Sequence, residues 1–305
     1  MTKEYLVSQE QAGMRIDKYL SEIQEELSRS YLQKLIKSGE VYVNGQAVKS
    51  SYKTASGDRI SFAVPEAVEP EIEAEPMDLD ILYEDEDLIV LNKPKGMVVH
   101  PAAGHYSQTL VNGLMYHCQG ELSGINGVMR PGIVHRIDMD TTGVLVVCKN
   151  DLAHSGIADQ LKVHSITRRY RAIVHGVIKE DSGTVNAPIG RHPVDRKKMA
   201  VNYKNGKEAV THYQVLERFR DFTYVECRLE TGRTHQIRVH MASIRHPLLG
   251  DEVYGPARTK QFLNLQGQTL HAGVLGFLHP RTGEYMEFTA PLPEYFTHLL
   301  ATLPK

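Results

Sequence analysis

The chain contains little cysteine and no long apolar segment. Its 305 residues include three cysteines, Cys118, Cys148 and Cys227, which are widely spaced and form no CxxC pair. This odd, scattered set predicts neither a disulfide framework nor a zinc site, and it fits a reducing compartment. The N-terminal segment MTKEYLVSQEQ lacks the apolar centre of a signal peptide, and no run of about 18 apolar residues follows. We therefore expect a cytoplasmic protein that is neither exported nor inserted in a membrane.

A strong net charge is also missing. The formal net charge is -2, which by itself argues against a nucleic-acid-binding protein. The charges are nevertheless segregated along the chain. Residues 66–87 include 11 acidic and no basic residues, whereas residues 161–207 include 11 basic and 3 acidic residues. The second segment is basic enough to dock on phosphates, because the local charge decides such binding.

The length and the composition predict two domains. A chain of 305 residues exceeds a typical single domain. Residues 63–80 are rich in proline and glutamate, which is typical of an extended linker whose like charges repel. We expect a small domain over residues 1–62, an acidic linker over 63–80 and a large domain over 81–305.

The small domain combines two short helices with a hairpin. Apolar residues at helical spacing predict a helix over Met14–Ile23. A second helix is expected to begin at Ser28, a good N-cap, and to stop at Gly39. Strand Val41–Val43 then leads into Asn44-Gly45, a strong signal for a tight hairpin turn. The polar face of the second helix presents Arg29, Gln33, Lys34 and Lys37.

Short strands dominate the large domain, with few helices between them. The predicted strands are Ile81–Tyr83, Leu88–Leu91, Val144–Cys148, Tyr170–Val174, Thr211–Val215, Tyr224–Glu230 and Gln236–His240. Two helices are expected, over Leu110–His117 and Asp151–Lys162. The absence of a regular strand–helix alternation indicates an α+β domain with a mixed, largely antiparallel sheet.

Three clusters of polar residues are candidates for a functional site. The first is GIVHRIDMDTTG, where His135, Arg136 and Asp138 lie in a loop that leads into a buried strand. A loop fixed by such a strand holds a catalytic group rigidly at a cleft, although an ordinary Asp/Thr/Gly turn has the same composition. The carboxylate of Asp138 is the candidate catalytic group.

The second cluster is TGRTHQIRVH, which brings several basic residues together. On a strand, Arg238 and His240 share one face and His235 lies opposite, so we expect no metal site from the two histidines. Arg238 is placed to keep Asp138 ionised and aimed, because a nearby cation favours the charged carboxylate. The alternative is that Arg238 forms a structural ion pair.

The third cluster is SITRRYRAIVHG, where Tyr170 lies among arginines. An aromatic ring between guanidinium groups suits stacking on a base with phosphates nearby, but a tyrosine in a strand is more often part of the core. The segment Arg191–Met199 is a basic loop, which is typical of a solvated surface.

These clusters carry a family resemblance. RIDKYL, SRSYLQKLIKSGEVYVNG and GDRISF resemble the S4 RNA-binding module over Met14 to Phe62. PGIVHRIDMDTTG, TGRTHQIRVH and LHAGVLGFLHPRTGE resemble the RluA/RluD family of pseudouridine synthases, over Met14 to about Pro293. Met139 stands where a basic residue is common in the family, and Cys148 replaces a frequent alanine.

The resemblance implies a role for each candidate residue. By the family pattern, Asp138 is the catalytic aspartate and Arg238 pairs with it, while Tyr170 stacks on the flipped uracil. Arg136, beside His135, fills the gap that the flipped uridine leaves. In the S4 module, the polar face of the second helix that carries Arg29, Gln33, Lys34 and Lys37 meets RNA.

The family resemblance also implies the reaction and the substrate. Uridine is isomerised to pseudouridine without redox change or phosphoryl transfer, so no cofactor, nucleotide or metal is expected, and the sequence has no GxxxxGK[ST] loop. GINGVMRPGIVHRIDMD and the S4 module resemble the RluD branch, which modifies 23S ribosomal RNA of the large subunit. We expect a monomer that acts on this RNA or on the assembling subunit. The alternatives are a non-catalytic S4-type assembly factor and a base-releasing glycosylase.

Overall fold

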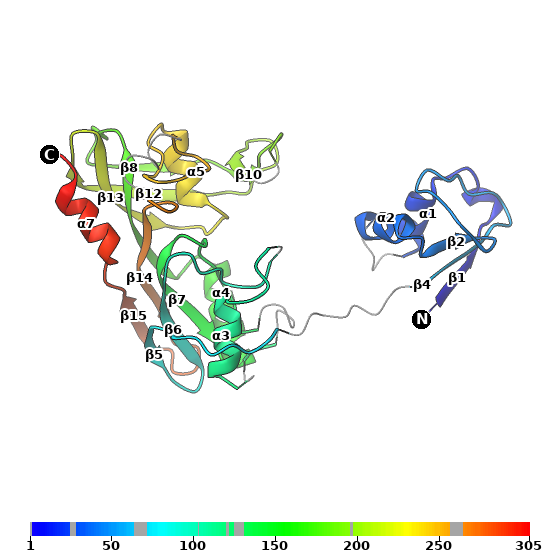
Figure 1. The fold of residues 1–305 in the computed structure, drawn as a ribbon, viewed down its shortest axis with the longest axis horizontal. Coiled ribbons are helices and arrows are strands. Elements are labelled where there is room, and N and C mark those ends of the chain that lie inside the picture. Colours follow the sequence, from blue (N-terminus) through cyan, green and yellow to red (C-terminus); the bar gives the residue numbers. More distant parts are fainter. Residues whose placement is uncertain are drawn as a thin grey trace. The chain divides into compact units, whose positions relative to one another are not determined.

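The computed structural model describes residues 2–24, 29–63, 72–102, 104–119, 122–124, 131–195, 198–256 and 265–305. The chain divides into two compact units, Met1–Glu69 and Pro70–Lys305, each of which is described by itself (Figure 1). The division falls inside the segment that we expect to be a linker. No helix in the described ranges combines the length and the hydropathy that a membrane span requires.

The N-terminal unit packs two helices on a small antiparallel sheet. Its sheet has the order β1-β4-β2-β3. The elements are β1 (Thr2–Leu6), η1 (Gln9–Gln11), α1 (Ile16–Ile23), α2 (Arg29–Lys37), β2 (Val41–Val43), β3 (Gln46–Ala47) and β4 (Arg59–Ala63). The turn between β2 and β3 has positive φ at Asn44 (52°) and Gly45 (81°), which is why this dipeptide suits a two-residue hairpin. The predicted hairpin is confirmed, and the apolar residues Leu32, Leu35 and Ile36 of α2 are buried in the core of this unit.

The polar face of α2 is partly engaged within this unit. Gln33 Nε2 donates a hydrogen bond to Asp17 Oδ2 at 2.6 Å. Asp17 is buried on α1, so this contact ties the two helices together. Lys37 is exposed at the end of α2. The side chains of Arg29 and Lys34, and the expected N-cap Ser28, lie outside the described residues.

A single mixed sheet organises the C-terminal unit. In the described residues its order is β5-β6-β7-β14-β8-β13-β12-β9, and β15 pairs with β14. The strands are β5 (Ile81–Glu84), β6 (Leu88–Lys93), β7 (Thr142–Cys148), β8 (Thr167–His175), β9 (Ser182–Asn186), β12 (Val210–Arg218), β13 (Phe222–Leu229), β14 (Leu270–Leu278) and β15 (Tyr285–Thr289). The pair β7–β14 is parallel and the others are antiparallel, which confirms the expected fold class. Strands β10 (Ile189–Arg191) and β11 (Met199–Val201) form a separate hairpin.

Helices cover both faces of this sheet. On one face, α3 (Leu110–His117) packs on β6 and β7, and α5 (Gln236–Ser243) packs on β8 and β13. On the other face, α4 (Asp151–Lys162) packs on β6 and β7, and α7 (Glu294–Thr302) packs on β8 and β13. Strand β7 is therefore buried on both sides along its whole length, as its continuous apolar sequence predicts.

One predicted element is wrong. The segment Gln236–His240 is not a strand but the first part of helix α5. Ile237 and Val239 alternate with polar residues, which imitates a half-exposed strand. Every residue from Gln236 to Met241 is buried, so the alternation does not separate an inner from an outer face. The other predicted strands overlap strands of the sheet, and both predicted helices of this domain are confirmed.

Candidate active site

The loop before β7 places Asp138 on the face of the sheet that α3 and α5 cover. Ile137 is buried beside Asp138, and the Thr141 N–H donates to the Asp138 carbonyl at 3.0 Å. Gly143, the second residue of β7, has φ 112°, and a Cβ there would lie 2.2 Å from the carbonyl oxygen of Ala272. Only glycine permits this approach to β14. The loop is thus fixed at both ends, and Asp138 has a defined position.

Arg238 joins Asp138 to a second carboxylate. Its Nη1 donates to Asp138 Oδ2 at 2.9 Å, while Nε and Nη2 donate to Asp251 at 2.7 and 3.0 Å. Burial alone would lower the pKa of Arg238, but the hydrogen bonds and charge of Asp251, together with Asp138, raise it above its ordinary value. The expected contact between Arg238 and Asp138 is present. Arg238 is a permanent cation with a fixed orientation.

Asp251 holds Arg238 from the buried side of this arrangement. Its side chain is fully buried, and its Oδ1 also accepts hydrogen bonds from the N–H groups of Val253 and Tyr254 at 2.9 and 3.1 Å. Burial would raise the pKa of Asp251, but Arg238 and these backbone donors lower it below its ordinary value. The carboxylate therefore stays charged and holds the guanidinium of Arg238.

His235 lies on the other side of Asp138. It occupies the N-cap of α5 with φ 56°, and its Nε2 is 3.8 Å from Asp138 Oδ1. Its Nδ1 is 2.9 Å from the hydroxyl of Tyr254, which accepts from the Met199 N–H at 2.9 Å. The Tyr254 hydroxyl can therefore donate its proton to Nδ1 of His235. The ring proton of His235 then lies on Nε2, which faces Asp138. Because α5 is a helix, His235 and Arg238 share one side instead of lying opposite, as a strand would require.

A cavity opens above Asp138. Tyr170, on β8, forms one wall, and burial raises the pKa of its phenol, so the ring is neutral. Arg136 is exposed at the mouth. The remaining lining residues are Ile137, Thr141, Leu229, Arg233, His235, Gln236, Ile237, Arg238 and Leu270. One carboxylate, one aromatic wall and several cations therefore converge on one hollow.

His135 is tied to the sheet. Its Nε2 accepts the Val146 N–H at 3.1 Å, so Nδ1 carries the proton. Burial, and then the charge of Arg168, lower the pKa of His135 to about 4. His135 is therefore a neutral residue in the loop of Asp138.

Lys93 supports the same loop from below. It is completely buried, and its Nζ donates to the carbonyl oxygens of Pro94, Met97 and Met139 at 2.8, 2.9 and 2.9 Å. Met139 directly follows Asp138, so these bonds fix the backbone beside the carboxylate. Burial lowers the pKa of Lys93 to about 7.

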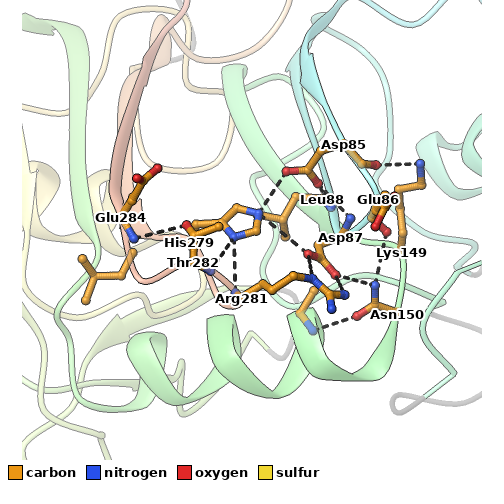
Figure 2. Close-up of polar contacts among 12 residues, drawn as sticks. Asp85, Glu86, Asp87, Leu88, Lys149, Asn150, His279, Arg281, Thr282 and Glu284 are labelled. Atoms are coloured by element: carbon orange, nitrogen blue, oxygen red, sulfur yellow. Dashed lines mark hydrogen bonds and ion pairs between the residues drawn. The ribbon is translucent and has the colours of Figure 1, made fainter.

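Three potential metal ligands lie close together elsewhere in the unit. The ligand atoms of Asp85, Asp87 and His279 are within 4.8 Å of one another. Backbone N–H groups of residues 281 and 282 donate to His279 Nδ1, so Nε2 carries the proton that points to Asp85 at 2.9 Å. Asp87 already accepts from Arg281 and Asn150 (Figure 2). A cation would have to displace these donors. The group is an ion-pair network that joins three turns.

The sequence itself matches known families. Residues 87–243 match the RNA pseudouridylate synthase family, and residues 14–60 match the S4 domain. This chain belongs to the RNA pseudouridylate synthase family. The activity expected from the motifs, that of an RNA pseudouridine synthase, and the expected S4 module are thereby confirmed.

Relatives match the synthase over its full length. An uncharacterized RNA pseudouridine synthase of Bacillus subtilis is 59% identical and covers 98% of this chain and 97% of its own. Ribosomal large subunit pseudouridine synthase D of Zymomonas mobilis is 50% identical over 96% of this chain and 95% of its own. The structure of human RNA pseudouridylate synthase domain containing 1 aligns with a TM-score of 0.59 and 26% identity, covering 76% of this chain and 99% of that one.

Several site residues of the synthase were not anticipated. Asp251 and Tyr254 lie in the GDEVYG stretch, and Lys93 lies in the NKPKG stretch. Neither stretch belongs to the three clusters of polar residues from which the site was predicted. Lys93 ends strand β6 and Asp251 lies in a loop, and the burial that distinguishes both residues is not visible in the sequence.

Proposed function

We propose that this enzyme isomerises uridines in a stem-loop of 23S ribosomal RNA, with Asp138 as the catalytic carboxylate. The observation that carries the proposal is the position of Asp138 in a cavity beside Tyr170, with Arg238 donating to it at 2.9 Å. The RNA substrate is supported by relatives named ribosomal large subunit pseudouridine synthase D, at 45 to 50% identity.

The chemistry accounts for a single carboxylate. The N1–C1′ bond breaks and a C5–C1′ bond forms, C5 loses a proton and N1 gains one. A glycosidase ordinarily needs a second carboxyl group as acid or base, but here the released uracil stays bound and reacts again. Asp138 either attacks C1′ or removes the C2′ proton. Both routes require the ionised carboxylate, which the adjacent Arg238 favours.

Base flipping gives Tyr170 and Arg136 their roles. A uridine must leave its stack to reach Asp138, which costs a few kcal/mol. Stacking on Tyr170 offsets part of this cost, and an inserted Arg136 replaces the missing base. The exposure of Arg136 at the cavity mouth and the wall position of Tyr170 support these roles.

The remaining expectations concern the setting of the reaction. Asp138, Tyr170 and Arg238 all come from one chain, which supports a monomeric enzyme. The three cysteines are free and buried, which supports the cytoplasm as its location. The exposed Lys37 supports RNA binding by the polar face of α2.

The test is tritium release from 23S ribosomal RNA transcript that carries C5-tritiated uridine. Wild type is expected to release tritium, and Asp138→Ala is expected to lose about 10⁴-fold or more in rate. Asp221→Ala, at an exposed aspartate of the same unit, serves as the matched control and should retain full activity. Full activity of Asp138→Ala would refute the assignment of the catalytic carboxylate.

Two outcomes would favour other functions. Free uracil in the reaction would indicate a base-releasing glycosylase. No release from ribosomal or transfer RNA, together with tight binding to the 23S transcript, would indicate a non-catalytic assembly factor.

A further inference from the structure

A second cavity adjoins the one above Asp138. Its volume is about 350 Å³, and it shares Asp138, Tyr170 and Arg136 with the first cavity. We call it the Arg168 cavity, because Arg168 lines this cavity and not the first one, whereas Arg233 lines both. Three guanidinium groups and one carboxylate face this hollow, and that carboxylate, on Asp138, already pairs with Arg238.

Arg168 is a buried cation without a carboxylate partner in the described residues. Only 6% of it is exposed, and its Nη2 donates to the backbone carbonyl of Glu230 at 2.8 Å. Its Nε has no hydrogen-bond acceptor within that part of the chain. A Cβ on Gly232 would lie 2.5 Å from Arg168 Nη1, so a side chain there would displace this guanidinium. Burying an unpaired charge costs several kcal/mol, and a bound anion would offset that cost.

The nearest acidic residues do not neutralise this cation. The side chain of Glu230 contacts His212 Nε2 at 2.5 Å, and only its backbone reaches Arg168. Arg233 lowers the pKa of Arg168 further, after burial, because the two like charges are close. Arg233 itself donates through Nε to a backbone carbonyl, that of Glu208, at 2.9 Å. Two guanidinium groups therefore face the same cavity, and each is held by a carbonyl dipole.

Other polar residues complete the lining. His135 is held neutral with its proton on Nδ1, since its Nε2 accepts from the backbone of β7. Thr234 and His164 also line the cavity. An anion with several oxygen acceptors fits this set of donors, because each donor needs its own lone pair.

We propose that the Arg168 cavity binds one phosphodiester of the RNA backbone next to the target uridine. This inference rests on the proposed function of the adjoining Asp138 cavity. A base that stacks on Tyr170 brings its own sugar-phosphate along, and the Arg168 cavity begins at the same tyrosine. Arg168 supplies the buried charge and Arg233 supplies a second donor group. The contact positions the nucleotide and does not depend on which base it carries.

The experiment combines a protein variant with a chemically altered RNA. Single phosphates flanking the target uridine of a hairpin substrate are replaced, one at a time, by uncharged methylphosphonate. Dissociation constants and single-turnover rates are measured for wild type, Arg168→Met, Arg168→Lys and Arg233→Met. Arg228→Met is the matched control, since Arg228 is exposed on β13 and lines neither cavity.

One flanking methylphosphonate is expected to weaken wild-type binding about tenfold, as the loss of a charge-assisted hydrogen bond would. Arg168→Met should weaken binding of the normal hairpin by a similar factor, and that methylphosphonate should then have no further effect. The slope of log Kd against log salt should fall in magnitude by about 0.7 to 0.9, one phosphate's share. Arg168→Lys should regain part of the phosphate dependence, and Arg228→Met should match wild type.

One pattern of binding penalties would contradict the phosphate contact. An active wild type in which every methylphosphonate penalty is equal in wild type, Arg168→Met and Arg233→Met would overturn the proposal. If thermal melting shows that Arg168→Met is unfolded, Arg233→Met decides by the same criterion. Absence of tritium release by wild type would instead refute the proposed function, and the binding measurements would still judge the phosphate contact.

Discussion

Arg238 Nη1 lies 2.9 Å from Asp138 Oδ2, although the two residues are 100 positions apart in the chain. The other edge of the same guanidinium holds Asp251 through two hydrogen bonds. A planar group pinned along one edge has little freedom at the other, so the donor that faces Asp138 is oriented before any substrate arrives.

This geometry predicts that lysine cannot replace Arg238. Arg238→Lys keeps the charge but loses the planar fork, so one ammonium group cannot hold Asp138 and Asp251 in the same arrangement. We expect the single-turnover rate to fall about 10- to 100-fold, whereas the RNA affinity should change by less than about threefold. Tritium release from a hairpin substrate, sampled at fixed times, measures this rate. Arg228→Lys controls for the substitution itself, and equal rates in both variants would contradict the role of the fork.

Asp251 and Asp138 should differ in what they contribute to stability. Asp251→Ala removes the fully buried partner of a buried arginine, so we expect a loss of about 3 kcal/mol in the free energy of unfolding. Asp138→Ala leaves Arg238 paired with Asp251 and should cost less than about 1 kcal/mol. Urea unfolding at pH 7 compares the two. A larger loss of stability in Asp138→Ala than in Asp251→Ala would mean that Asp138, and not Asp251, is the main stabilising partner of Arg238.

The Asp87–Arg281 pair should make stability depend on pH. Hydrogen bonds from Arg281 lower the pKa of Asp87 to about 2, despite burial. The unfolded carboxyl has a pKa of about 3.9, so the pair stabilises the fold fully above that pH and loses its effect as the pH falls toward 2. We expect Asp87→Asn to be about 1 to 2 kcal/mol less stable than wild type at pH 7.

Urea unfolding between pH 7 and pH 3 tests this dependence. The difference between wild type and Asp87→Asn should shrink below about pH 4, since the unfolded carboxyl of wild type then takes up a proton that the folded Asp87 does not. Asp221→Asn is the control, because Asp221 is exposed. A difference that stays constant down to pH 3 would assign the effect of the substitution to packing instead of charge.

The N-terminal unit should contribute to RNA binding separately from chemistry. It has its own buried core, which includes Ile16, Leu20 and Leu35, so its removal should leave the catalytic unit folded. We expect deletion of residues 1–62 to weaken binding to structured ribosomal RNA about tenfold or more. The single-turnover rate on a short hairpin should change little. Equal losses on both substrates would argue against a separate docking role.

The sequence was sufficient to predict the loop of Asp138 and the buried strand that follows it. Both signals are local, since a run of apolar residues and a polar turn occur within a few positions of each other. The contact with Arg238 was also expected, but it came from the resemblance and from general electrostatics. Nothing in the local pattern measures which residues meet across 100 positions.

The errors have a common physical cause. Helix α5 was taken as a strand because its polar residues, Gln236, Arg238 and His240, are buried with partners instead of facing solvent. Periodicity predicts secondary structure only where polarity follows exposure. The same reason hides Asp251 and Lys93, whose polar atoms are satisfied by distant groups. Strand β14 escaped prediction because Gly273 and Gly276 interrupt its apolar pattern.

The order of the sheet has a consequence for synthesis on the ribosome. Strand β14 lies between β7, which follows the loop of Asp138, and β8, which carries Tyr170. These two halves of the sheet are made first, yet the strand that pairs with both, residues 270–278, lies near the end of the chain. A nascent chain therefore contains both residues long before it contains their shared pocket. The cavity above Asp138, which Leu270 also lines, can form only after this last strand of its wall has been synthesised.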